Sequence, residues 1–200
     1  MFYMELLFAT SNLHKLSEAQ KIIGASIKLR GLLELGITEE IPEEYFTIEE
    51  NARFKAQYLY QKSGKDCIAD DTALEVQALD GAPGYLSARY AGLEADSQKN
   101  NTKLLHMLKG EKNRLAQFRT VILLIRGGRE FLFQGVLKGE IIEELRGSHG
   151  FGYDPLFKPV DSTLTLAEMG IEQKNEISHR AIALRALALF LKECGRDGKQ

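Results

Sequence analysis

The stretch ADDTALEV, Ala69 to Val76, places two aspartates side by side directly after the apolar residues Cys67 and Ile68. Adjacent residues on a strand point to opposite faces of a sheet. One of Asp70 and Asp71 is therefore expected to turn inward, where an unpaired carboxylate has a large desolvation cost. A group beside it must offset that cost.

Strand and helix patterns alternate on both sides of this stretch. Two runs rich in β-branched residues around Gly127-Gly128 predict a hairpin. Such a mixture predicts an α/β fold with a central mixed sheet flanked by helices. We expect strands at 5–9, 27–29, 67–69, 74–78, 118–125 and 130–137, and helices at about 13–23, 47–62, 96–108 and 178–193.

The composition is that of an ordinary globular chain, with 44% hydrophobic and 27% charged residues. The 26 Lys and Arg against 28 Asp and Glu argue against a nucleic-acid surface, which carries a basic excess. Two cysteines without metal or disulfide spacing are interpreted as reduced thiols. Neither a signal peptide nor a membrane span is recognisable. We expect one cytoplasmic domain over 1–200.

The segment TSNLHK, Thr10 to Lys15, lies between the first predicted strand and helix. Exposed amides and the positive end of a helix dipole favour a phosphate at such a place, and Lys15 adds charge. A plain helix cap by Ser11 or Asn12 explains the same residues. This stretch alone leaves both interpretations open.

The pair Asp70-Asp71 and the upstream Glu43 and Glu44 supply carboxylates at predicted strand ends and loops. Mg²⁺ prefers hard oxygen ligands and takes only one or two protein carboxylates together with waters. The alternative is a turn or cap in which one aspartate accepts bonds from backbone amides.

Two later segments are polar without a structural need. GSHGFGYDP, Gly147 to Pro155, frames two aromatic rings with glycines, which suits stacking on a nucleobase, although a tight turn with buried rings is equally compatible. EQKNEISHR, Glu172 to Arg180, gathers Lys174, His179 and Arg180 near a helix start, where they favour an anion or a carbonyl. A histidine with its hydrogen bonds satisfied in the core or at the surface is the simpler interpretation of His179 taken alone. Together the four segments indicate a nucleotide polyphosphate site, in a hydrolase, a kinase or a sensor.

Other chemistries lack their motifs. The four histidines show no HExxH or paired-ligand spacing, so zinc is not indicated. A GxSxG nucleophile elbow is also missing, so serine hydrolysis has no support.

The blocks TSNLHK, ENARFKA, ADDTALEV, GAPGYLSARYAG, GFGYDPLF and LAEMGIEQKNEISHR occur in the order typical of the inosine triphosphate pyrophosphatase family. The sequence resembles these non-canonical purine NTP pyrophosphatases, or XTP/dITP diphosphatases, from Leu6 to the last helix. Maf-like pyrophosphatases share the architecture, but the SHR and GFGYDP blocks favour the purine family.

The resemblance implies two lobes with an active-site cleft between them, a homodimer, and Mg²⁺-dependent cleavage between the α and β phosphates of ITP, dITP or XTP. It implies that Asp71 is the general base and that Glu43 and Asp71 hold the metal, with Glu44 as an alternative to Glu43. Asp70 is expected to fix the loop or contact the metal's ligands. The implied substrate-binding residues are Thr10, Ser11, Asn12, Leu13, His14, Lys15, Thr72, Phe151, Gly152, Tyr153, Asp154, Lys174, His179 and Arg180.

The sequence departs from the family at Ala73, where relatives carry glycine, whereas Thr72 keeps the hydroxyl of the usual serine. Arg180 is expected to donate to the C6 oxygen of the purine, which ITP has and ATP lacks. The sequence leaves open how GTP is rejected. A sensor without turnover and a pyrimidine-selective Maf-like enzyme are the competing hypotheses.

Overall fold

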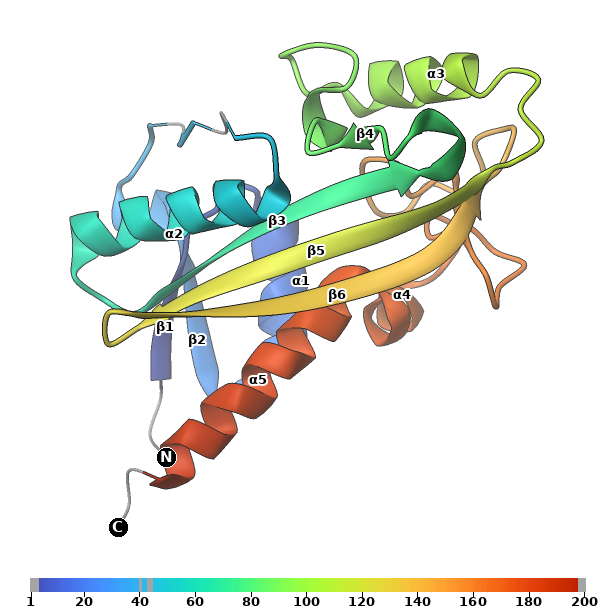
Figure 1. Ribbon diagram of the computed structural model, residues 1–200. Helices are drawn as coiled ribbons and strands as arrows, with labels where there is room; N and C mark the ends of the chain where they lie inside the picture. The colour runs from blue at the N-terminus through green and yellow to red at the C-terminus, as the bar shows by residue number, and fades with distance from the viewer. Residues whose placement is uncertain (1–3, 40, 43–44, 198–200) are drawn as a thin grey trace. The chain divides into compact units, whose positions relative to one another are not determined.

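The computed structural model describes residues 4–39, 41–42 and 45–197. Seven strands and five helices are assigned within these residues (Figure 1). The strands are β1 Met4–Phe8, β2 Ile27–Gly31, β3 Cys67–Val76, β4 Pro83–Gly84, β5 Leu115–Arg126, β6 Arg129–Ile141 and β7 Phe157–Pro159. The helices are α1 Leu13–Ile23, α2 Ile48–Ser63, α3 Ser97–Met107, α4 Ile171–Ile177 and α5 His179–Asp197.

The strands form one mixed sheet in the order β2-β1-β3-β5-β6-β7, and β4 pairs with β3. β1 runs parallel to β2 and β3, whereas β4 is antiparallel to β3 and β7 is antiparallel to β6. The predicted α/β class is therefore confirmed. The predicted hairpin is present, with its strands longer than expected. The short β4, β7 and α4 were not predicted, since each is too brief to show a period.

The chain forms two compact units, each with its own buried core. β3, β5 and β6 contribute residues to both, so neither unit is one continuous segment. A single domain over 1–200 stays a prediction. Unit 1 comprises Met1–Asp71, Thr120–Gly135 and Arg180–Gln200, and unit 2 comprises Thr72–Arg119 and Val136–His179.

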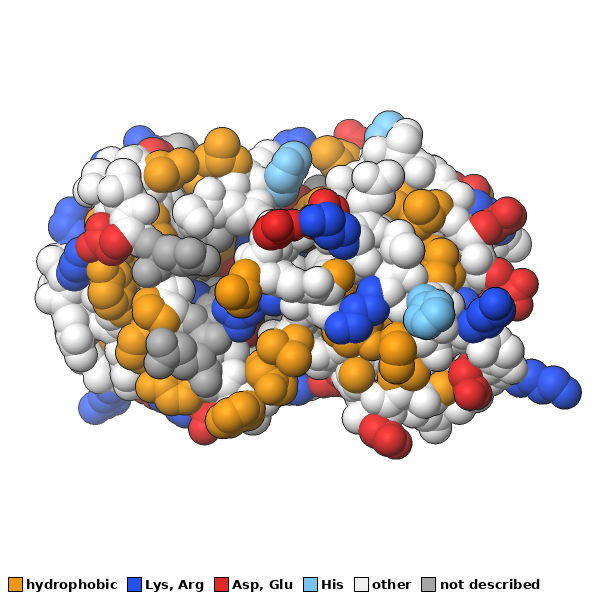
Figure 2. Space-filling model, turned by 90° about the horizontal axis from the view of Figure 1, so that it is seen from above, with side chains coloured by type: hydrophobic (Ala, Val, Ile, Leu, Met, Phe, Trp, Pro, Cys, Tyr) orange, Lys and Arg blue, Asp and Glu red, His pale blue; other side chains and the backbone are white. Residues whose placement is uncertain are grey.

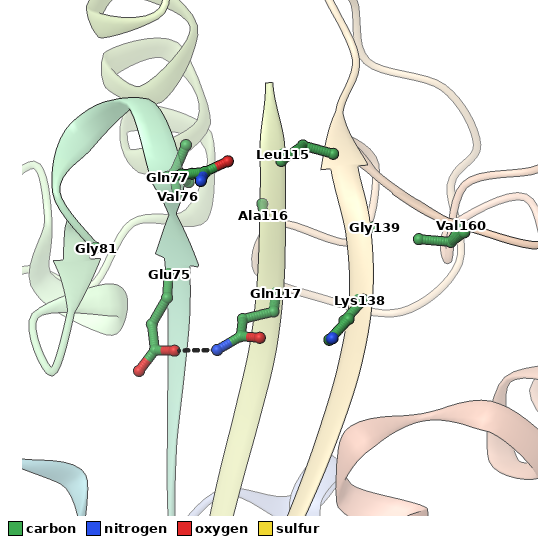
Figure 3. A pocket seen from close by; sticks show the side chains of 10 residues that line it. All are labelled: Glu75, Val76, Gln77, Gly81, Leu115, Ala116, Gln117, Lys138, Gly139 and Val160. Atoms are coloured by element: carbon green, nitrogen blue, oxygen red, sulfur yellow. Dashed lines mark hydrogen bonds between the residues drawn. The ribbon is translucent and has the colours of Figure 1, made fainter. Parts of the chain in front are cut away.

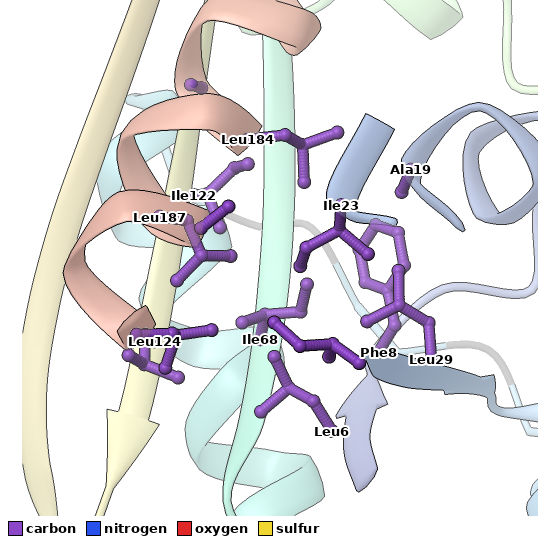
Figure 4. Packing of buried hydrophobic residues seen from close by; sticks show 14 residues of the cluster. Leu6, Phe8, Ala19, Ile23, Leu29, Ile68, Ile122, Leu124, Leu184 and Leu187 are labelled. Carbon is purple, nitrogen blue, oxygen red and sulfur yellow. The ribbon is translucent and has the colours of Figure 1, made fainter. Parts of the chain in front are cut away.

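In unit 1, helices α1 and α5 pack on one face of the sheet (Figure 4). Leu6, Phe8 and Ile68 on this face meet Ile23 of α1 and Leu184 of α5. Helix α2 lies on the opposite face, where the Cys67 thiol contacts the carbonyl of Ala56 at 3.3 Å. The sheet in unit 1 is therefore covered on both faces.

This double covering corrects two predictions about the aspartates. The predicted break between two short strands is absent, because β3 continues through both residues and ends at Val76. Both Asp70 and Asp71 are buried, at 2% and 7% exposure, where only one was expected to turn inward. Alternation sends them to opposite faces, but neither face of unit 1 is open to solvent.

Local signals set the helix ends as predicted. Asn12 caps α1 by accepting from the amides of His14 and Lys15, and Gly24 ends it with φ +83°. Thr47 caps α2 with Glu50 three residues on, which satisfies amides that have no partner within the helix.

The core of unit 2 lies on one face of its part of the sheet. Leu74 of β3 and Phe118 of β5 pack there with Leu104 of α3 and with Tyr153 and Phe157. The glycine-rich loop that contains Tyr153 is therefore part of the core of this unit.

Two further expectations concern the chain as a whole. Cys67 and Cys194 are free cysteines, as predicted, and burial raises the pKa of Cys67 to about 12. Across the described residues, no helix combines the length and the apolar character needed to cross a bilayer. On the face drawn in Figure 2, acidic and basic side chains are interspersed with apolar ones.

Candidate active site

The Asp70 carboxylate lies on the α1 and α5 side of β3, where it meets two cations. Its Oδ1 accepts from Lys15 Nζ at 3.0 Å, and its Oδ2 accepts from Arg180 Nε at 3.2 Å. Arg180 Nη1 also donates to Glu18 Oε2 at 2.6 Å. One buried cluster therefore joins the start of α1, the middle of β3 and the start of α5.

The charges of this cluster determine its protonation. Burial alone would raise the pKa of Asp70, but Lys15, Arg180 and Lys55 together hold that pKa well below its usual range. Burial would lower the pKa of Arg180, but Asp70 and Glu18 outweigh it and raise that pKa. Both groups of the Asp70–Arg180 pair are therefore charged at neutral pH.

The Asp71 carboxylate lies on the α2 side of the same strand. Lys55 Nζ, on the buried stripe of α2, lies 3.2 Å from Asp71 Oδ1, and both side chains are less than a tenth exposed. Each aspartate thus has a lysine supplied by the helix layer on its own side. Asp70 was expected to fix a loop or to contact the metal's ligands. The first expectation is wrong, because Asp70 lies within β3 and is held by Lys15 and Arg180.

The first helix start shows the helix cap, one of the two interpretations that the sequence left open. Asn12 Oδ1 accepts hydrogen bonds from the amides of His14 and Lys15, so the predicted cap is confirmed. Thr10 Oγ1 accepts from the amide of Asn12 at 3.1 Å. The side chains of Ser11 to His14 are exposed, whereas Lys15 is half-buried against Asp70. Phosphate binding by Thr10 to Lys15 stays a prediction.

In unit 2, the Asp154 carboxylate organises the glycine-rich loop. Its Oδ2 accepts from the amide of Phe151 at 2.8 Å and from Lys174 Nζ at 2.7 Å, and Asp154 and Lys174 are both buried. A side chain at Gly150, where φ is +78°, would collide with this carboxylate. The Lys174 ammonium also lies 5.0 Å from the centroid of the half-buried Phe151 ring.

The other predicted binding residues of unit 2 differ in exposure. Tyr153 is 4% exposed and donates its hydroxyl to the carbonyl of Ser87 at 2.8 Å, while burial raises its pKa. The ring of His179 stacks on Phe118 with centroids 4.7 Å apart. Thr72 is half-buried on β3. Tyr153 therefore serves the core, and Phe151 is the more accessible ring.

The predicted metal ligands are only partly described. Glu43 and Glu44 lie outside the described residues. Within those residues, no three His, Cys, Asp or Glu side chains are grouped so as to hold a metal ion. Asp70 is engaged by two cations, and the metal ligation expected of Asp71 stays a prediction.

A pocket in unit 2 lies away from the predicted residues. It lies on a sheet face that carries Glu75, Gln117 and Lys138 (Figure 3). Glu75 is engaged there by Gln117 at 2.7 Å and by Arg119 at 2.9 Å. This pocket contains none of the residues implied by the sequence.

Comparison with known proteins identifies the family. A model of the Ham1 family matches residues 6–190. The chain belongs to the Ham1 family. The resemblance found in the sequence is thereby confirmed over the range expected for it.

Ham1-family relatives match along nearly their whole length. The chain is 48% identical over 184 residues to a protein of Flavobacterium johnsoniae named dITP/XTP pyrophosphatase, covering 92% of this chain and 96% of that protein. A protein of Porphyromonas gingivalis with the same name is 49% identical over 188 residues, covering 94% and 97%. The structure of the Staphylococcus aureus Ham1 protein matches with a TM-score of 0.86 and 38% identity, covering 94% of this chain and 98% of that one.

Sequence reasoning missed two residues in this Ham1-family chain. Lys55 lies in the ENARFKA block, and its spacing from Ala52 and Leu59 places it on the buried stripe of α2. A lysine on a buried stripe signals a buried carboxylate, so Lys55 could have been found. Glu18 gave no such signal, because only the tertiary fold brings it to Arg180.

Proposed function

We propose that this chain hydrolyses non-canonical purine nucleoside triphosphates, ITP, dITP and XTP, to the monophosphate and pyrophosphate, and so clears them from the nucleotide pool. The pair of buried aspartates on β3, each held by a lysine, supports this proposal most directly. It supplies carboxylates and ammonium groups in a chain whose relatives are named dITP/XTP pyrophosphatases. The enzyme class is a hydrolase of phosphoanhydride bonds.

In this proposal Asp71 accepts the proton of the water that attacks the α-phosphorus. An ionised carboxylate held by Lys55 is fixed in place for this step. Lys15 lies at the start of α1, where its ammonium and the helix N-terminus favour the phosphates. Asp70 orients Lys15 and is not itself a base, because it is engaged by two cations.

The donor set fits Mg²⁺, which takes hard oxygens and needs only one or two protein carboxylates. Asp71 is such a ligand, and Glu43 is proposed as the second. When bound, the ion would neutralise charge on the phosphates and on the leaving pyrophosphate.

Purine recognition is proposed for Phe151, Lys174, His179 and Arg180. The half-buried Phe151 ring offers a flat face for stacking, and Lys174 next to it is a donor for a purine oxygen. The Arg180 guanidinium, a planar group held by Asp70 and Glu18, is proposed as the donor to the C6 oxygen of the purine. A nucleotide held in a cleft between two lobes is part of this proposal.

Replacing Phe151 with Ala should weaken purine binding by about 1–3 kcal/mol, because stacking on an aromatic ring contributes that much per base. KM for ITP and the melting temperature are measured together. The matched control is Phe133→Ala, which removes a partly buried ring packed on the core of unit 1, outside the predicted site. A large loss of melting temperature with an unchanged KM would instead assign Phe151 to the core.

Replacing Arg180 with Lys should reduce the preference for ITP over ATP. The lysine keeps the charge beside Asp70 and Glu18 but loses the planar fork that would donate to the C6 oxygen. The ITP-to-ATP ratio of kcat/KM values should fall by a factor that corresponds to about 2–4 kcal/mol. This is the cost of losing a charged hydrogen bond in a site that rejects a mismatched base.

The exposed Arg185 on the same helix provides the control, since Arg185→Lys should leave the ratio unchanged. If Arg180→Lys slows ITP and ATP equally, Arg180 holds a phosphate, and His179 or Lys174 becomes the reader of the base.

The experiment that tests the function is pyrophosphate release from ITP, XTP, dITP, ATP, GTP and UTP with Mg²⁺. We expect the three non-canonical purines to be preferred. Binding without turnover would indicate a sensor, and preference for UTP a pyrimidine-selective enzyme. A homodimer and a cytoplasmic location belong to the same proposal. Sedimentation equilibrium measures the oligomeric state.

A further inference from the structure

Asn101 lies on α3 in unit 2 and is 5% exposed. Its Nδ2 donates to the carbonyl of Gly152 at 3.0 Å. Gly152 lies between Phe151 and Tyr153 and adopts φ +64°, a conformation that side chains other than hydrogen disfavour. A residue outside the predicted site thus holds the loop at a position where the backbone conformation favours glycine.

Three polar contacts fix this loop within unit 2. Asp154 accepts from the amide of Phe151 at 2.8 Å, and the hydroxyl of Tyr153 donates to the carbonyl of Ser87 at 2.8 Å. Asn101 binds the peptide that joins Gly152 to Tyr153, between these two contacts. The backbone on both sides of Phe151 is therefore held, and the ring is attached to a fixed segment of the loop.

The side-chain oxygen of Asn101, Oδ1, argues against the view that this residue only fills space in the core. Its Oδ1 is buried and has no hydrogen-bond partner among the described residues. Burying such an acceptor has a free-energy cost that leucine, of similar size, would avoid. A side chain that only filled space on this face of α3 would therefore be leucine, as it is at the neighbouring buried position Leu104. The donor bond to Gly152 explains the asparagine.

We propose that Asn101 is a positioning residue for purine binding, which orients the Phe151 ring through the carbonyl of Gly152. This inference rests on the proposed function, in which the loop 151–154 binds the base. Its physical basis is preorganisation, because a loop that is already ordered loses less entropy when the ligand binds.

The test compares Asn101→Leu with the wild-type chain by calorimetric titration of IMP and, separately, of pyrophosphate. IMP should bind roughly 3–10-fold more weakly, as expected when about one additional side chain must be ordered on binding. Pyrophosphate should bind as before, and the melting temperature should stay the same or rise, because the buried acceptor is gone. Asn101→Asp, which keeps Oδ1 but replaces the donor, should weaken IMP at least as much.

Asn100→Leu is the matched control on the same helix. Asn100 is also buried, but it binds the backbone of Ala88 and Ala91. The Asn100→Leu variant should have a lower melting temperature than the wild-type chain, without a comparable change in IMP binding. Amide hydrogen exchange should speed up at 151–154 in Asn101→Leu and at 88–91 in Asn100→Leu.

Unchanged exchange at 151–154 or unchanged IMP binding in Asn101→Leu would overturn the inference. An equal loss of IMP binding in both leucine variants would also overturn it, since that pattern indicates a general loosening of α3. Pyrophosphate release from ITP by the wild-type chain is measured in parallel. Its absence would contradict the proposed function, while exchange, which needs no substrate, still decides whether Asn101 holds the loop.

Discussion

Asp71→Asn is expected to lose most of its turnover while keeping the fold. The amide has the size of the carboxylate but cannot accept a proton from the attacking water. Removing a general base reduces the rate by roughly 10²–10⁴-fold. Pyrophosphate release from ITP with Mg²⁺ measures the loss, and the far-UV circular dichroism and melting temperature check the fold.

The matched control for Asp71→Asn is Glu75→Gln on the same strand. Glu75 is also a carboxylate in an ion pair, in its case with Arg119, but it lies outside the predicted site. We expect this variant to keep its turnover within a few-fold. A well-folded Asp71→Asn variant with near wild-type turnover would remove Asp71 from the chemistry, and Glu43 would become the first residue to test.

Asp70→Asn is expected to destabilise the protein at neutral pH by about 3–5 kcal/mol, because removing one partner of a buried ion pair leaves the other charge uncompensated. The cation concerned is Arg180, which is 3% exposed and would lose its ion pair with Asp70. Urea unfolding at pH 7 measures the difference in the free energy of unfolding.

The same pair predicts how that difference depends on pH. The pKa of Asp70 is lower in the folded protein than in the unfolded chain, so on acidification the unfolded chain binds the proton first. The stabilisation by Asp70 is therefore complete above about pH 5 and is lost progressively below about pH 4, as the pH falls toward the folded pKa. The gap between wild type and Asp70→Asn should narrow over that range.

The exposed carboxylate of Asp161 is the control. Asp161→Asn should change stability by no more than about 0.5 kcal/mol, as is usual for a surface position. Equal stability of wild type and Asp70→Asn at pH 7 would show that the Asp70 cluster does not stabilise the fold. A gap that stays constant down to pH 3 would contradict the lowered pKa of Asp70 in the folded protein.

Local patterns determined much of the architecture. The caps at Asn12 and Thr47, the stop at Gly24 and the hairpin at Gly127-Gly128 act over a few residues, so each could be read in sequence order. The helical spacing of apolar residues in α5 likewise indicates its buried face, on which Ala181, Leu184 and Leu191 lie. The family followed from blocks of residues in a fixed order.

The tertiary structure alone decided which side chains contact the site residues. The alternation of β3 predicted opposite directions for Asp70 and Asp71, but only the helix layers on both faces of unit 1 make both of them buried. Arg180 meets Glu18 across 162 positions of the chain, and Asn101 meets Gly152 across 51. No local period encodes such contacts, because burial and charge pairing depend on which elements pack together. The sequence by itself therefore determined the elements and the kind of chemistry, whereas packing decided which charge holds each aspartate.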